Sequence, residues 1–303
     1  MVSSRDFKIL WATNQDEKLD ALYRDNKLAL LYFKLFQKKS YWKILGIRLD
    51  SQLRKHGFLT QDEQSELKTL YKSDLLYKFL RLNDYVCSNE LFPVTDAMRK
   101  SREAYHIITS RQKDFPASKL FEENAGAAIA VVGNAPIEEG NRNLRQKVNI
   151  DASDIVVRFN KFQINSYEEH NIGTKCSWLA MICNNYTRAE FPTILTDNPL
   201  FDYVGSDFIE QVLKTQLRNV YFIPQQDVVE LADQLQALPS SGVRLIYALH
   251  KHRASFKLFG FSFFNEENNS DSFEHYFEKK KHSEQYHSAQ KEKTFLLQLL
   301  SEK

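Results

Sequence analysis

A chain of 303 residues with 43% hydrophobic side chains is long enough to bury a large core, so we expect a globular protein. Its 41 Lys and Arg side chains nearly balance 39 Asp and Glu, and this near-neutrality excludes a dedicated nucleic-acid binder. Cys87, Cys176 and Cys183 form neither a paired framework nor a metal-ligand spacing, which favours a reducing compartment. With no apolar run of ~18–20 residues and no apolar core of a signal peptide at the start, a cytoplasmic protein is expected.

The first 125 residues are predicted to form a helical region. Apolar side chains recur at helical spacing in residues 16–39 and again in residues 65–83. Prolines and a polar stretch at 110–125 mark the expected boundary with a second domain, residues 126–303.

Residues 28–43 combine leucines and aromatic side chains with several lysines. This composition allows two interpretations. The segment could make a peripheral contact with an anionic membrane surface, or it could be a helix packed on the next domain. Packing is the favoured interpretation, because aromatic stripes at helical spacing are mostly part of a core.

From residue 126 onward, strand-like and helix-like runs alternate, which predicts an α/β domain with a mostly parallel sheet flanked by helices. The expected strands lie at residues 128–132, 154–158, 177–182, 193–196, 219–223 and 256–260. The expected helices lie at residues 138–147, 206–216, 226–236, 241–251 and 287–300.

Two neighbouring strands of this predicted sheet end in asparagine. The first stops at Gly133 and Asn134, and the second stops at Asn160. Because the carboxyl ends of parallel strands lie at one edge of a sheet, these ends predict a nucleotide crevice. The spaced glycines of a dinucleotide fingerprint and a Walker loop are both absent from the sequence.

A third polar segment, Pro-Ser-Ser-Gly at residues 239–242, precedes an amphipathic helix. Two hydroxyls and free backbone N–H groups at a helix start can hold a phosphate. Taken alone, however, the segment is better explained as an ordinary serine-capped helix.

The candidate base lies near the C-terminus. His287 lies at or near the start of the last amphipathic helix, where the helix dipole favours a neutral imidazole that can accept a proton. Glu292, five residues on, lies roughly 140° around the helix from His287. Glu292 is therefore expected to have a structural role, such as holding a neighbouring loop. For any single histidine, including His275, a surface or structural role is the default interpretation.

Together, these segments resemble glycosyltransferase family 29, the animal sialyltransferases, whose members carry four ordered sialylmotifs. The large motif is similar to Val131–Asn134, Ile150–Asp154, Val156–Asn160 and Gly173–Lys175. The small motif is similar to Leu238–Gly242 and on to Gly260–Phe261, the third to His275-Tyr276-Phe277, and the very small motif to His287 with Glu292. The resemblance covers residues 126–303 and does not extend to the first region.

The resemblance implies a GT-A-like, Rossmann-like variant of the α/β fold and an inverting transfer from a CMP-sugar donor to a glycan acceptor, with no metal or other cofactor. It implies that His287 is the general base and that His275 contacts the phosphate or leaving group. The donor-binding residues that it implies are Gly133, Asn134, Asn160, Ser240, Ser241, Gly242, Gly260 and Tyr276. Structural roles around the site are expected for Asp154, Arg158 and Glu292.

Two departures from the animal family predict a bacterial-type, cytoplasmic member. The positions of the animal disulfide correspond here to Ile129 and His252, and the anchor and stem of Golgi members have no counterpart. Such an enzyme is expected at the inner membrane face in lipopolysaccharide or capsule synthesis, with a lipid-linked glycan as one acceptor option. Sialic acid is the first choice of sugar and Kdo the alternative. An alternative of another class is a non-catalytic nucleotide-binding scaffold, against which the presence of both His275 and His287 argues.

Overall fold

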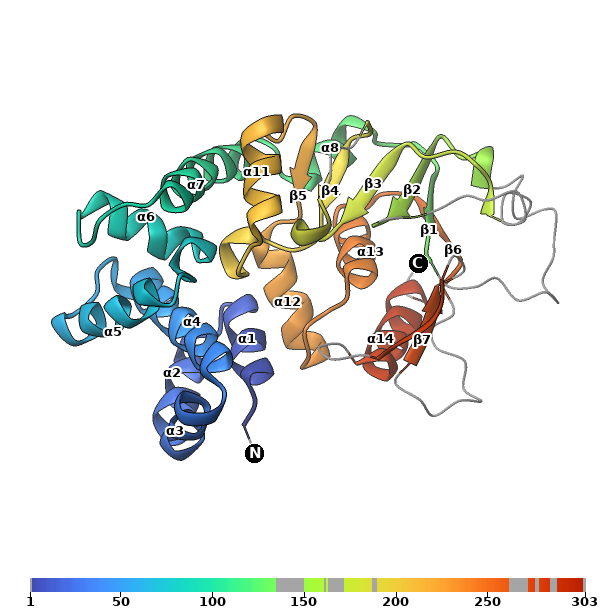
Figure 1. Cartoon of the computed structure of the whole chain (residues 1–303). Coiled ribbons are helices and arrows are strands. Elements are labelled where there is room, and N and C mark those ends of the chain that lie inside the picture. The colour runs from blue at the N-terminus through green and yellow to red at the C-terminus, as the bar shows by residue number, and fades with distance from the viewer. Residues whose placement is uncertain are drawn as a thin grey trace. The chain divides into compact units, whose positions relative to one another are not determined.

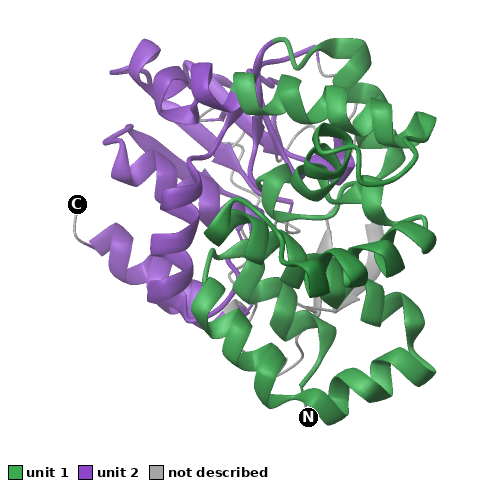
Figure 2. Cartoon of the chain, turned by 90° about the vertical axis from the view of Figure 1, so that its left-hand side faces the viewer, with its two compact units in different colours: residues 1–111, 198–218 green, residues 112–197, 219–303 purple. Residues whose placement is uncertain are grey.

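The computed structural model describes residues 2–134, 150–160, 162, 172–186, 190–261, 272–275, 278–283 and 288–301. The chain divides into two compact units, coloured separately in Figure 2. The first comprises Met1–Arg111 and Asn198–Arg218, and the second comprises Gln112–Asp197 and Asn219–Lys303. This division falls earlier in the chain than the boundary expected at residue 125, and it assigns a later segment to the first unit. The predicted domain roles stay predictions.

The first unit is helical throughout its described residues, as the N-terminal sequence predicted. Its α-helices are α1 (Ser4–Ala12), α2 (Asp16–Asp25), α3 (Lys27–Phe36), α4 (Lys38–His56), α5 (Gln61–Lys72), α6 (Leu80–Ser88), most of α7 (Asp96–Asp114) and α11 (Ser206–Thr215) (Figure 1). The short 3-10 turns are η1 (Leu76–Lys78) and η4 (Pro199–Phe201). α4 is the central helix, since α1, α2, α3, α5 and α6 all contact it.

Apolar burial and one buried carboxylate fix the packing around α4. Trp11 is almost fully buried in the core of the first unit, and its indole Nε1 donates to Asp50 Oδ2 at 2.9 Å. Arg81 Nη1 donates to the same oxygen at 2.7 Å. Burial raises the pKa of Asp50 above its ordinary value, and the charges of Arg81 and Arg54 oppose that rise. The carboxylate is paired from both sides, as a buried charge requires.

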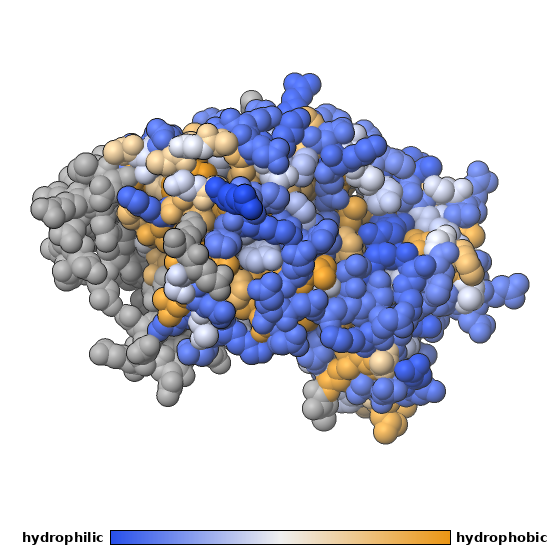
Figure 3. Space-filling model, turned by 180° about the vertical axis from the view of Figure 1, so that it is seen from behind, coloured by the Kyte–Doolittle hydropathy of each residue, from blue (hydrophilic) through white to orange (hydrophobic). Residues whose placement is uncertain are grey.

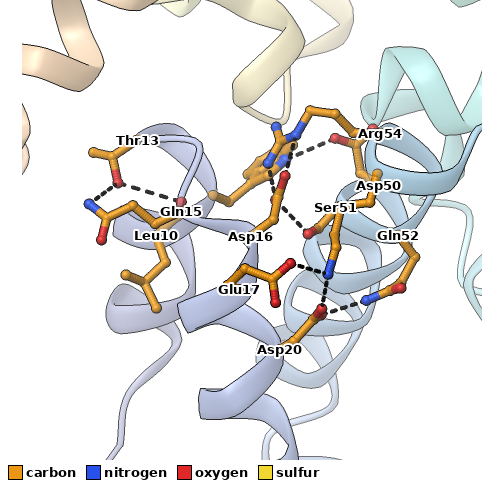
Figure 4. A network of polar contacts seen from close by, with 12 residues as sticks. Leu10, Thr13, Gln15, Asp16, Glu17, Asp20, Asp50, Ser51, Gln52 and Arg54 are labelled. Atoms are coloured by element: carbon orange, nitrogen blue, oxygen red, sulfur yellow. Dashed lines mark hydrogen bonds and ion pairs between the residues drawn. The ribbon is translucent and has the colours of Figure 1, made fainter.

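A polar network joins α2 to α4 (Figure 4). Asp16 accepts hydrogen bonds from Ser51 Oγ at 2.5 Å and from Arg54 Nε at 2.9 Å, and it also bonds Arg54 Nη2. Asp20, one helical turn on, accepts from Lys55 Nζ at 2.7 Å. Because α2 buries few apolar side chains, these bonds hold its polar face on α4.

α3 packs through only one of its faces. Leu30 and Phe33 are buried in the core of the first unit, whereas Leu28, Leu35 and Phe36 on the other side of the helix are exposed. The favoured interpretation placed this helix on the next domain, whereas the buried face of α3 packs in the core of its own unit, against α4. None of the described helices has the length and apolar character needed to cross a bilayer.

The second unit contains a six-stranded sheet of order β5-β4-β3-β2-β1-β6, and every neighbouring pair is parallel. Its strands are β1 (Ile129–Val132), β2 (Ile155–Phe159), β3 (Trp178–Met181), β4 (Thr193–Leu195), β5 (Val220–Phe222) and β6 (Phe256–Phe259). All six predicted strands are confirmed. They read as short apolar runs because a parallel sheet is buried on both faces.

The helices of the second unit are α8 (Ala117–Glu123), α12 (Gln225–Leu235), α13 (Ser241–Lys251) and α14 (Ala289–Ser301), with the short 3-10 turn η3 (Cys183–Asn185). A two-stranded antiparallel hairpin joins β7 (Ser272–His275) to β8 (Glu278–Ser283). The helices expected at 206–216, 226–236, 241–251 and 287–300 are confirmed as α11, α12, α13 and α14. The helix expected at 138–147 lies outside the described residues.

Alternation along each strand sends side chains to two layers. Ile129 and Val131 of β1 join a core with α8 and α13, whereas Ala130 and Val132 join a second cluster with Ile150. α12, α13 and α14 share a further core of their own. Both faces of the sheet are therefore buried, and its strands hold the segments at their carboxyl ends in fixed positions.

The network of Figure 4 predicts that Asp16→Asn lowers the free energy of unfolding by about 1–3 kcal/mol. The amide would place an NH₂ group where the carboxylate accepts bonds from Ser51 and Arg54. Asp25→Asn is the matched control, because Asp25 makes only an exposed ion pair with Arg24; it should change stability by less than about 0.5 kcal/mol. Urea unfolding measures both variants, and equal effects would contradict the role of the network.

Candidate active site

The strand order places a topological switch point between β1 and β6. From β1 the chain adds β2, β3, β4 and β5 successively on one side, and then places β6 on the other side of β1. Ligands of open α/β sheets bind outside the carboxyl ends of the strands at such a point. The crevice predicted from the sequence would therefore lie at the ends of β1 and β6, with the end of β2 beside them.

The ends of β1 and β6 approach each other closely at two glycines. Gly133 N donates to the carbonyl of Phe259 at 2.8 Å, which continues the ladder beyond both strands. A Cβ atom at Gly133 would lie 2.5 Å from the carbonyl oxygen of Gly260. Gly260 itself has φ +63°, a conformation that favours glycine. Both predicted glycine sites thus have a steric reason in the structure.

The two predicted asparagines lie beside this junction. Asn134 Nδ2 donates to the carbonyl of Phe159, the last residue of β2, at 3.3 Å. Asn160, with φ +49°, accepts on Oδ1 from Ile182 N at 3.3 Å and from Asn185 Nδ2 at 3.4 Å. The ends of β1, β2 and β3 are therefore linked by carboxamide side chains at one edge of the sheet.

The start of α13 lies at the same edge. A Cβ atom on Gly242 would lie 3.2 Å from the ring of Phe261, which directly follows Gly260. Arg244, only 7% exposed, donates to the carbonyl of Pro239 at 2.8 Å and to that of Thr196, just after β4, at 3.0 Å. Arg244 was not predicted as a site residue, and its only signal in the sequence is a charge within an otherwise apolar helix.

Glu292 of α14 holds the residue that precedes α13. Its carboxylate is 4% exposed and accepts from Ser240 N at 2.6 Å and from Ser240 Oγ at 2.7 Å. This is a loop-holding contact of the kind expected for Glu292. It differs from the expectation that both serine hydroxyls face a ligand, because Ser240 directs its hydroxyl to Glu292. The backbone N–H groups of residues 241–243 have no intrahelical acceptor, as in any first turn.

Two other residues of the large motif make structural contacts. Asp154 Oδ2 accepts from Ala128 N at 2.8 Å and so joins the starts of β1 and β2, at the edge opposite the crevice. Arg158, 1% exposed in β2, donates to the carbonyls of Lys175 at 2.9 Å, Ile172 at 2.8 Å and Gly173 at 3.0 Å. The buried guanidinium group thus has backbone carbonyl partners, and these hydrogen bonds fix the segment that precedes β3.

Asp151 fixes the same segment and was not predicted as a site residue. Its Oδ1 accepts from Thr174 N at 3.0 Å and from Lys175 N at 3.1 Å. Gly173 has φ +67°, and a side chain there would overlap the carboxylate of Asp151. The signal in the sequence was the pairing of an Ile-Asp-x-x-Asp run with a later Gly-Thr-Lys, because only the fold shows that the two segments meet.

The two histidines with predicted catalytic roles lie in or beside segments outside the described residues. His275 is the last residue of β7, and its backbone pairs with Glu278 of β8. Tyr276 and His287 lie outside the described residues, so their roles stay predictions.

The two positions that the sequence resemblance aligns with the animal disulfide are Ile129 and His252. Ile129 is buried in β1, and His252 follows α13, with Nε2 3.4 Å from Asp227 Oδ2. Cys87, Cys176 and Cys183 are free, and burial raises the pKa of Cys176 to about 11 against the opposing charge of Arg158. Within the described ranges, no group of three His, Cys, Asp or Glu side chains could hold a metal ion.

Part of the chain matches the model of one protein family. Residues 193–303 match the model of glycosyltransferase family 29 (sialyltransferase), so the segment from β1 to β3 lies outside the match. A mammalian sialyltransferase solved in complex with Gal-beta-1-3GalNAc-ortho-nitrophenol is 18% identical, with 72% of this chain and 81% of that chain covered and a TM-score of 0.47. A second mammalian sialyltransferase structure is 19% identical, with coverages of 66% and 82% and a TM-score of 0.42. None of the curated proteins matches the chain.

The junction of β1 and β6 predicts that Gly133→Ala is strongly destabilising. The added methyl group would meet a backbone oxygen that cannot move aside, and overpacking of this kind typically costs 1–3 kcal/mol or more. Gly242→Ala is the matched control, because the ring of Phe261 can shift and alanine favours a helix by up to about 1 kcal/mol. Its net effect should stay within about 1 kcal/mol in urea unfolding. A Gly133→Ala protein as stable as the Gly242→Ala protein would contradict the close approach.

The contact between Glu292 and Ser240 predicts coupled effects on stability. Glu292→Gln and Ser240→Ala should each destabilise, and the double variant should lose about 0.5–3 kcal/mol less than the sum of the two. Thr294→Ala is the control partner, because its hydroxyl bonds only Gln290 in the same helix. Denaturant unfolding of both double-mutant cycles measures the coupling. An additive Glu292–Ser240 pair would show that the contact does not hold the loop.

Proposed function

We propose that the chain transfers sialic acid from CMP-sialic acid to a hydroxyl group of a glycan acceptor, because residues 193–303 match the model of glycosyltransferase family 29 (sialyltransferase). The family match is the observation that carries the proposal. The position of the polar groups supports it, since Gly133, Asn134 and the start of α13 lie at the switch-point edge where an α/β sheet binds a nucleotide.

The geometry at this edge suits a nucleoside monophosphate. The carboxamides of Asn134 and Asn160 would contact the cytidine and ribose, with Gly133 and Gly260 allowing the backbone to approach the ligand. The N–H groups of Ser241 and Gly242 at the start of α13 would meet the phosphate, favoured by the positive end of the helix dipole.

In the proposed reaction, the acceptor oxygen attacks the anomeric carbon as the bond from that carbon to the phosphate oxygen breaks, with inversion. His287 accepts the proton of the attacking hydroxyl, and His275 donates a hydrogen bond to the departing CMP phosphate. CMP is already a good leaving group, so a base, a phosphate contact and orientation suffice. The proposal includes no metal and no other cofactor.

The proposal extends to a cytoplasmic, bacterial-type enzyme that works on surface-glycan precursors, including lipid-linked ones. The support is the resemblance noted in the sequence, which aligns Ile129 and His252 with the cysteines of the animal disulfide; in the structure His252 contacts Asp227. A chain built without that bond suits a reducing compartment.

Nucleotide binding is the first test of the proposed function. CMP and CMP-sialic acid should raise the melting temperature by several degrees at saturating concentration, because a ligand that binds only the native state stabilises it. UDP-sugars and GDP-sugars should have no effect. Stabilisation by CMP-Kdo and not by CMP-sialic acid would move the assignment to a Kdo transferase, and stabilisation by UDP alone would contradict the family chemistry.

The same preparations separate binding from turnover. His287→Ala should lower sialyl transfer to a lactoside by about 10²–10⁴-fold while keeping the thermal shift with CMP. Exposed His56 of the first unit is the control position, and His56→Ala should leave both signals unchanged. Binding of CMP without transfer or donor hydrolysis by the unaltered protein would indicate the non-catalytic scaffold.

A further inference from the structure

The outer face of α3 is an apolar surface that no other part of the described structure covers. Its five side chains recur at i, i+3, i+4, i+7 and i+8, so they lie along one face of the helix. They are Leu28, Leu31, Tyr32, Leu35 and Phe36, which are 85%, 51%, 47%, 59% and 73% exposed. Figure 3 shows hydrophobic side chains gathered over this helix, at the lower right of that view. The opposite face of α3 packs inward through Leu30 and Phe33.

This concentration is unlike the rest of the described surface. The other large hydrophobic side chains that are exposed there, Phe58, Val94 and Leu297, belong to separate segments of the chain. Single exposed apolar residues are normal, whereas a contiguous apolar patch marks an interaction site. The rings of Tyr32 and Phe36 pack on each other, with centroids 5.4 Å apart, so the apolar face is continuous.

Positive charge borders this face, and no negative charge interrupts it. Lys27 and Lys34 are exposed and lie three or four residues from Leu31, along one edge of the face. Lys38 and Lys39, also exposed, follow at the start of α4. Between residues 27 and 43 the sequence contains five lysines and neither Asp nor Glu. The partner must therefore supply an apolar layer beneath a layer of negative charge.

A second copy of this chain does not offer this combination of apolar groups and negative charge. A symmetric contact would place the same face, with its lysines, against itself, and it would bring like charges together. A bilayer surface with anionic lipids has both layers, since acyl chains accept the leucine and aromatic side chains while phosphate groups accept the lysines. α3 has ten residues, which is long enough to lie in the headgroup region and too short to cross the bilayer.

We propose that the α3 surface, defined as the five exposed apolar side chains together with Lys27, Lys34, Lys38 and Lys39, binds an anionic lipid bilayer as a peripheral contact. The inference rests on the first unit alone and is independent of the proposed transfer reaction. It explains why α3 carries apolar side chains on both faces, since one face packs on α4 and the other enters the lipid.

Co-sedimentation of the full chain with lipid vesicles tests the proposal. Vesicles of equal parts phosphatidylglycerol and phosphatidylcholine should bind the protein at low salt. Pure phosphatidylcholine vesicles should bind it at least tenfold more weakly, because each lysine near an anionic surface contributes about fivefold. Raising the salt to 0.5 M should weaken binding to the anionic vesicles, since the lysine contribution is screened. Absence of binding to anionic vesicles at low salt would overturn the proposal.

Two variants separate the apolar and charged contributions. Leu31→Ser with Leu35→Ser should reduce binding at least tenfold at both salt concentrations. Lys34→Gln with Lys38→Gln and Lys39→Gln should reduce it at least tenfold at low salt. Both sets change exposed positions, and circular dichroism and thermal melting confirm that each variant folds.

Matched controls come from exposed positions elsewhere in the chain. Phe58→Ser with Leu297→Ser controls the apolar variant, and Lys68→Gln with Lys72→Gln and Lys214→Gln controls the charge variant. Control variants that lose as much binding as the α3 variants would overturn the proposal. So would a concentration-dependent dimer in sedimentation velocity that Leu31→Ser with Leu35→Ser abolishes while vesicle binding is unchanged.

Discussion

The candidate site depends on the approach of two backbones at the switch point of the sheet. β1 and β6 are neighbours in parallel register, and their ladder continues one step beyond both strands to Gly133. A side chain at Gly133 would meet the carbonyl oxygen of Gly260. With no side chain there, the ends of both strands can approach to backbone contact. Asn134 is carried to its place beside β2 by this junction.

Buried charges fix the loops around that junction. Arg158, Arg244 and Glu292 are each less than 10% exposed, and each bonds backbone groups of a segment distant in the sequence. A buried charge without such partners would cost several kcal/mol, so the loop and the charge stabilise each other. The backbone groups of these loops are thereby held in a defined geometry.

The two units differ in their structure and in the role that we propose for each. The second unit has the parallel sheet, and the proposed nucleotide site lies at the carboxyl ends of its strands. The first unit has a helical core organised by α4 and a helix, α3, that is apolar on two faces. The proposed transfer to lipid-linked acceptors would benefit from the proposed binding of α3 to the bilayer, because enzyme and acceptor would then meet by diffusion in two dimensions.

The sequence alone was enough to predict the strands and the edge of the sheet at which a ligand is expected. Six apolar runs predicted the six strands, and Asn134 and Asn160 predicted the crevice, because local periodicity and strand ends are written in neighbouring residues. Tertiary structure alone decided that Asp151 meets the Gly173 loop and that Ser240 gives its hydroxyl to Glu292, since these contacts join segments more than 20 residues apart. It also decided the outcome for α3. Helical spacing is the same for a buried and an exposed apolar stripe, and only packing against α4 shows which face of the helix remains uncovered.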